Sequence, residues 1–157
     1  MFKIRKIDRG DIERVLDLVL DFERYLIDVD DSLVSEPFPR ARYMKTLLEG
    51  LYDEKHTFLV AEIDGRVIAF IDYWAYPEFL HGGLTGYMNN LYVDGDHRGK
   101  GIGSALVDHV MEEAQRKGIV AMHVPVKPLN RRAVEFYIRK GIDEQLVMME
   151  TRLDGRP

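Results

Sequence analysis

The fold is decided by the stretch Leu91-Tyr92-Val93-Asp94-Gly95-Asp96-His97-Arg98-Gly99-Lys100-Gly101-Ile102-Gly103-Ser104-Ala105-Leu106. An apolar run that ends at Val93 predicts a strand, and apolar residues at helical spacing begin at Ile102. Glycines alternate with other residues between the two. Glycine lets a backbone approach a ligand closely, and a helix N-terminus presents unpaired N–H groups. The stretch therefore predicts a strand, a loop and a helix start that bind an anionic group such as a diphosphate.

Two better-known phosphate loops do not fit this stretch. The loop of nucleoside triphosphatases needs Ser or Thr directly after its lysine, and Lys100 is followed by Gly101. The dinucleotide fingerprint needs a third glycine where Ser104 stands, at the start of a longer parallel unit. A different diphosphate ligand is therefore expected.

Two segments together resemble the signatures of the GCN5-related N-acetyltransferases. The first, Arg98-x-x-Gly101-x-Gly103, is similar to the (Gln/Arg)-x-x-Gly-x-(Gly/Ala) loop with which that family binds the pyrophosphate of acetyl-coenzyme A. The second begins 27 residues after Gly103 and runs from Asn130 to Ile142. It resembles Asn-x-x-Ala-x-x-(Phe/Leu)-Tyr-x-x-x-Gly-Phe, with Ile142 in place of the usual Phe. The resemblance covers nearly the whole chain, and these two segments are its specific part.

Hydrophobic periodicity predicts alternating strands and helices along the chain. The expected strands are 2–7, 57–63, 67–73, 87–93, 119–124 and 145–153, and the expected helices are 12–22, 40–48, 102–116 and 130–140, with loops at 28–31 and 76–86. Asp64-Gly65 predicts a tight hairpin between the second and third strands. This order indicates an α/β (α+β) domain over residues 1–157, and the resemblance implies a mixed, mostly antiparallel central sheet flanked by helices. In that fold two central strands splay apart, which puts the coenzyme slot between Tyr92-Val93 and His123-Val124.

Composition excludes several classes of protein. With 157 residues, 46% hydrophobic and 31% charged, the chain is expected to be one cytoplasmic domain with no membrane span or signal peptide. It has no cysteine, which excludes disulfides and an enzyme thioester. A net charge of −5 argues against a general nucleic-acid binder and is compatible with a cationic substrate.

The resemblance implies which residues bind acetyl-coenzyme A. The expected contacts are Leu91, Tyr92, Val93, Arg98, Gly99, Lys100, Gly101, Ile102, Gly103, Ser104, Asn130, Ala133 and Tyr137. Helical spacing puts Ala133 and Tyr137 on the face of Asn130. By the resemblance, Asn130 bonds the pantetheine amides and Tyr137 protonates the departing thiolate. A phenol with a pKa of about 10 can protonate a thiolate whose acid has a pKa of about 8.5. The alternative for Tyr137 is a core residue whose hydroxyl finds a partner.

The expected reaction is direct attack of an amine on the thioester. By the resemblance, a backbone N–H near Tyr92 or Val93, at the bulged end of the central strand, stabilises the developing oxyanion. Many relatives carry an acidic residue where this chain has Asn89 and Asn90. An amide is no base, so these side chains are expected either to orient a water or the substrate, or to form a plain polar pair. Candidate bases are Glu36, Asp72 and His81, with a water chain to bulk solvent as the alternative.

Other polar and aromatic residues have two interpretations each. The acidic residues Asp28, Asp30, Asp31 and Glu36 either recruit a cationic amine or form a solvated loop. The aromatic residues Phe22, Tyr25, Trp74, Tyr76 and Phe79 either wall the acceptor pocket or pack. Arg131 and Arg132 either reach the coenzyme's 3′-phosphate or lie on a solvated helix face.

The histidines do not have the spacing of a metal site, so no metal is expected. His123 lies on a strand that lines the predicted slot and is either a ligand-facing or a satisfied core histidine.

Together these observations predict an N-acetyltransferase that moves the acetyl group of acetyl-coenzyme A to a primary amine, either a small amine or a polyamine-like one. The first alternative is a protein acetyltransferase acting on an N-terminal or lysine amine. The second is an acyl-coenzyme A binding or sensing module without turnover, which Asn89 and Asn90 keep open. The resemblance also implies a homodimer, because members of that family often pair through their last strands.

Overall fold

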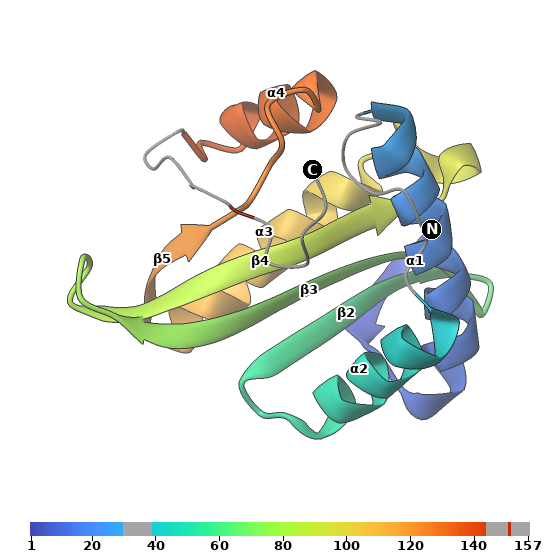
Figure 1. Ribbon diagram of the computed structural model, residues 1–157, viewed down its shortest axis with the longest axis horizontal. Helices are drawn as coiled ribbons and strands as arrows, with labels where there is room; N and C mark the ends of the chain where they lie inside the picture. The colour runs from blue at the N-terminus through green and yellow to red at the C-terminus, as the bar shows by residue number, and fades with distance from the viewer. Residues whose placement is uncertain (30–38, 144–150, 152–157) are drawn as a thin grey trace.

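The computed structural model describes residues 1–29, 39–143 and 151, and Figure 1 shows the arrangement of the elements. The strands are β1 Lys3–Lys6, β2 His56–Ile63, β3 Arg66–Glu78, β4 Gly83–Val93 and β5 Ile119–His123. The α-helices are α1 Ile12–Val29, α2 Arg40–Tyr52, α3 Ile102–Arg116 and α4 Arg131–Arg139, with 3₁₀ turns at Arg9–Asp11 and Gly95–His97. Among the described residues, no helix is long and apolar enough to cross a membrane.

The strands form one five-stranded sheet in the order β1-β2-β3-β4-β5. The first three pairings are antiparallel and the pairing of β4 with β5 is parallel, which confirms the mixed, mostly antiparallel sheet. The parallel pairing extends only from Leu84 to Tyr87 on β4, whereas β4 continues to Val93. β5 ends at His123, so β4 and β5 no longer pair beyond Tyr87 and His123, where the sequence predicts the coenzyme slot.

The two faces of the sheet are covered by different helices. On one face α1 and α2 pack on β2, β3 and β4, with Phe70 and Tyr92 in the cluster beneath them. On the other face α3 packs on β3, β4 and β5, and Ile71 and Met88 belong to its cluster. Because successive strand residues point to opposite faces, alternation along β3 and β4 decides which side chains meet α1 and α2 and which meet α3.

Several boundaries differ from the sequence expectations, and helix α1, expected to end at residue 22, runs to Val29. Helix α2 continues through Gly50, which was expected to end it, to Tyr52. A glycine is needed at this position because a Cβ would stand 2.6 Å from the Phe58 Cε2. The segment 76–86, expected as a loop, is mostly paired strand, since β3 extends to Glu78 and β4 begins at Gly83. Pro77 is tolerated there because β2 begins at His56, opposite Trp74, so that no described strand pairs with the β2 side of β3 at Pro77.

Other expectations fall at the ends of the described segments. Asp28, expected in a loop, is part of α1. Asp30, Asp31 and Glu36 lie outside the described residues, as does nearly all of the expected strand 145–153.

Candidate functional site

The glycine loop joins the end of β4 to the start of α3. Gly99 and Gly101 adopt φ values of +77° and +78°, which favour glycine, and Gly101 is the N-cap residue without any side-chain cap. The first helical bond runs from the Ala105 N–H to the Gly101 carbonyl. The N–H groups of residues 102–104 consequently precede the regular ladder of the helix, as an anion site at a helix N-terminus requires. A Cβ at Gly101 would meet no protein atom within 4 Å, so the loop borders open space.

The two cations of the loop lie differently. Arg98 turns back, with its Nε donating to the Val93 carbonyl at 2.9 Å and its guanidinium 4.8 Å above the Tyr25 ring and 5.0 Å above the Tyr92 ring. Lys100 stays exposed, and its Nζ bonds the Asp96 carbonyl at 3.0 Å. In this arrangement Arg98 links the loop to α1 and β4, and Lys100 is the exposed cation of the loop.

The second signature, from Asn130 to Ile142, contains helix α4 and its N-cap residue Asn130. Asn130 is 8% exposed and caps the helix, its Oδ1 accepting from the Ala133 N–H and from the Tyr25 hydroxyl, each at 3.3 Å. The Asn130 Nδ2 is thus the side-chain group left to donate to a cofactor. Tyr137 is 9% exposed and belongs to the cluster that α3 forms with the sheet. This burial raises the pKa of the Tyr137 phenol well above its usual value, so the phenol keeps its proton at alkaline pH.

The bulge of β4 is not at Tyr92 or Val93, where it was expected. Tyr92 and Val93 pair regularly with β3, whereas Asn89 has no partner between the pairs Tyr73–Met88 and Asp72–Asn90. One extra residue bends the strand and re-aims the side chains that follow it. The bulge therefore lies just beyond Tyr87, where β5 stops pairing with β4.

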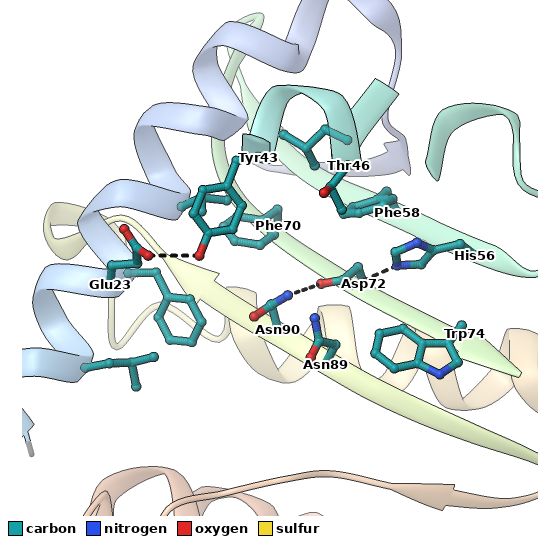
Figure 2. A pocket seen from close by; sticks show the side chains of 14 residues that line it. Glu23, Tyr43, Thr46, His56, Phe58, Phe70, Asp72, Trp74, Asn89 and Asn90 are labelled. Carbon is teal, nitrogen blue, oxygen red and sulfur yellow. Dashed lines mark hydrogen bonds and ion pairs between the residues drawn. The ribbon is translucent and has the colours of Figure 1, made fainter. Parts of the chain in front are cut away.

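A cavity of about 340 Å³ opens beside this bulge, on the sheet face that carries α1 and α2 (Figure 2). Its walls come from both helices and from three strands. They are formed by Val19, Phe22, Glu23, Leu26, Tyr43, Thr46, Leu47, His56, Phe58, Phe70, Asp72, Trp74, Asn89 and Asn90. The walls combine aromatic rings with carboxylates and amides, as expected of a pocket for a small cationic group.

Asp72 is the most deeply buried charged side chain of this cavity, at 1% exposure. Its Oδ1 accepts from the Asn90 Nδ2 at 2.8 Å, and its Oδ2 lies 2.8 Å from the His56 Nε2 (Figure 2). These two contacts hold the carboxylate in a fixed orientation. They also fix Asn90, whose amide oxygen points away from Asp72 in Figure 2.

The structure separates the residues expected on the acceptor side. Phe22 and Trp74 line the cavity, and Tyr87 stacks on Trp74 with 4.8 Å between ring centroids. Phe79 is fully exposed at the tip of the β3–β4 hairpin. Of the three candidate bases, Asp72 lines the cavity, and His81 bonds Glu78 on the hairpin at 2.6 Å.

His56, Tyr43 and Glu23 were not singled out from the sequence. The Tyr43 hydroxyl bonds Glu23 at 2.9 Å across the cavity. These residues come from three elements far apart along the chain, and no short motif contains them.

Known proteins share both the sequence pattern and this architecture. The model of the acetyltransferase (GNAT) family matches residues 19–142. The chain belongs to this family. Its fold is likewise that of a predicted acetyltransferase from Clostridium acetobutylicum, solved with acetyl-CoA, at a TM-score of 0.79 and 22% identity over 99% of each chain.

Two relatives are similar over most of this chain. An uncharacterized N-acetyltransferase of Methanocaldococcus jannaschii is 29% identical over 153 residues, and the alignment covers 94% of this chain and 63% of that protein. The chain thus spans less than two thirds of that relative. A thialysine N-epsilon-acetyltransferase of Sus scrofa is 30% identical over 148 residues, covering 88% of this chain and 82% of that protein. Family and relatives together support an acetyl-CoA-dependent acyltransferase.

Proposed function

We propose that this chain transfers the acetyl group of acetyl-CoA directly to a primary amine held in the cavity beside Asn89 and Asn90. One observation carries the proposal: the cavity, with the buried Asp72 carboxylate in its wall, opens at the bulge where β4 and β5 part. An amine bound in this cavity approaches the reaction centre from the sheet face that carries α1 and α2. The thioester approaches it from the gap between β4 and β5.

The residues of the two signatures fit the coenzyme. The pyrophosphate binds the N–H groups of residues 102–104, with Gly99 and Gly101 giving it room and Lys100 balancing its charge. Leu91 to Val93 line the slot beside the pantetheine arm. Asn130 donates through its Nδ2, and Ala133 stands on the same helix face. When bound, acetyl-CoA supplies the activated acyl group.

Groups of the chain stabilise the oxyanion and protonate the thiolate that form during the reaction. The amine nitrogen forms a bond to the carbonyl carbon, and the carbon–sulfur bond then breaks. Backbone N–H groups of β4 that follow the bulge and have lost β5 as a neighbour stabilise the oxyanion. Tyr137 gives its proton to the thiolate. The proton from the ammonium leaves through water, because both Asp72 carboxylate oxygens are already engaged by Asn90 and His56.

Asp72 and Asn90 select the acceptor. The carboxylate supplies a buried negative charge, and the Asn90 amide oxygen, turned away from Asp72, accepts from the ammonium. The ring of Trp74 adds a cation–π surface. The relative that acts on thialysine makes lysine-like side-chain amines the first acceptors to test.

Release of free thiol from acetyl-CoA tests the proposal against a panel of acceptors. The panel contains thialysine, lysine, a polyamine and peptides with a free N-terminal amine or an internal lysine. We expect turnover with a small cationic amine and none without an acceptor. Turnover with the peptides alone would favour the protein acetyltransferase. Acetyl-CoA binding without thiol release for any amine would favour a sensing module.

A further inference from the structure

A second group of polar side chains lies at the far end of the β3–β4 hairpin, outside the cavity. Glu78 ends β3, His81 stands in the hairpin turn, and His123 ends β5. One ligand atom from each residue lies within 4.8 Å of those of the other two. The Glu78 Oε2 is 2.6 Å from the His81 Nδ1 and 4.0 Å from the His123 Nε2.

The sheet fixes where these residues stand. Glu78 pairs with Gly83 across the hairpin, and His123 pairs with Tyr87 in the parallel ladder. Two of the three ligands are therefore held by strand register. His81 is the adjustable one, since its side chain is 39% exposed, against 18% for Glu78 and 22% for His123.

Neighbouring hydroxyls orient two of the three side chains. The Thr85 hydroxyl, on a fully buried residue, donates to the Glu78 Oε2 at 2.9 Å. The Tyr76 hydroxyl lies 3.1 Å from the His123 Nδ1. Such a partner on one ring nitrogen leaves the other, Nε2, to face Glu78. Hydrogen bonds of this kind orient the ligands of protein metal sites.

The charge of the group also suits a cation. Glu78 contributes a carboxylate, and His81 and His123 contribute imidazole nitrogens, which are both ligand types that transition metals bind in proteins.

We propose that Glu78, His81 and His123 bind a divalent transition metal such as Zn²⁺, with the fourth coordination position open. Zinc takes imidazole and carboxylate ligands at about 2.0–2.2 Å in a tetrahedral arrangement, which sets ligand atoms about 3.4 Å apart. To reach that spacing, the 2.6 Å between the Glu78 Oε2 and the His81 Nδ1 must lengthen by a rotation of His81, and the 4.0 Å between the Glu78 Oε2 and the His123 Nε2 must shorten. The metal ties the hairpin to the end of β5, at the point where β4 and β5 part. The sequence did not indicate this metal site, because His81 is 3 residues and His123 is 45 residues from Glu78 along the chain.

Metal binding is measured on the full chain without a polyhistidine tag, by competition of Zn²⁺ against a chromophoric chelator. Co²⁺ then reports the coordination number through its visible absorption. We expect one site per chain, a four-coordinate Co²⁺ spectrum and a rise in Tm with Zn²⁺. Affinity should fall at pH 5.5, because protons compete for the imidazoles.

Substitutions separate this site from unspecific binding. Glu78→Gln and His81→Ala should each weaken Zn²⁺ binding at least about tenfold, and Tyr76→Phe about tenfold through the lost orientation of His123. His109→Ala, on α3, is the matched control and should leave the affinity within about twofold. Equal affinity in wild type and His81→Ala, or an equal loss in the control, would overturn the proposal. So would the absence of Zn²⁺ binding by folded wild-type protein at about 100 μM metal. None of these readouts depends on acetyl transfer.

Discussion

Replacing Gly101 by alanine tests the coenzyme loop against a control that the same helix provides. Gly101 precedes α3 with φ +78°, and Gly118 follows it with φ +74°. A Cβ at either position would meet no protein atom within 4 Å. Both substitutions therefore impose the same backbone strain without a steric clash. Only the one at Gly101 adds an atom to the space proposed for the pyrophosphate.

The strain costs about 1–2 kcal/mol for an alanine in the left-handed region. In a chain of this size that lowers Tm by about 2–8 °C. Both variants should show this loss by thermal unfolding. For acetyl-CoA, calorimetry should give a Kd raised at least about tenfold for Gly101→Ala, because bonds to a charged group are worth about 1.5–3 kcal/mol each. The Kd of Gly118→Ala should match that of wild type.

Two outcomes would refute the reasoning. If Gly101→Ala lost stability like Gly118→Ala and still bound acetyl-CoA with unchanged affinity, the phosphates would not lie at this loop. If neither variant lost stability, the backbone conformation of both glycines would be wrong.

Three further predictions concern catalysis. Tyr137→Phe should lower kcat about 100-fold and leave the Kd of acetyl-CoA unchanged, as expected for the loss of a general acid; a drop below about threefold would remove the phenol from the mechanism. Asp72→Asn, nearly isosteric, should raise KM for a cationic amine about 10–100-fold with a smaller effect on kcat, whereas the exposed control Asp17→Asn should change neither. For a lysine-like acceptor, kcat/KM should rise about tenfold per pH unit between about pH 7 and 9, because the neutral amine is the nucleophile and its pKa is about 10.4. The raised pKa of Tyr137 keeps the acid protonated over this range, so no alkaline decline is expected; a plateau below pH 8 would indicate a side-chain base.

Features encoded by neighbouring residues were predictable from the sequence. The helix of the second signature begins after Asn130, which caps it, and Gly141 follows it at φ +73°. The hairpin at Asp64-Gly65 has positive φ at both residues, the conformation that its sequence favours. Caps, positive φ and periodicity act within one or two turns of chain, so a short window of sequence contains the whole cause.

Other features depended on pairing between distant segments. Gly50 predicts a helix end by propensity, but the close approach to Phe58 keeps a glycine inside α2. The hairpin of β3 and β4 includes Pro77, which pairs with Leu84, because β2 does not extend beyond the position opposite Trp74. Tertiary contacts outweigh local preferences of about 1 kcal/mol at such positions.

The sequence by itself determined the family, the order of the strands and helices that the structure describes, and the loop with its glycines. Only the tertiary structure decided which polar groups share the cavity: it set Asp72 against His56 and Asn90, and it moved the bulge to Asn89. It also brought Glu78 and His81 to His123. The physical reason is register. One residue of slip between paired strands turns every side chain to the other face, and register is set by the whole packed sheet rather than by any single stretch of chain.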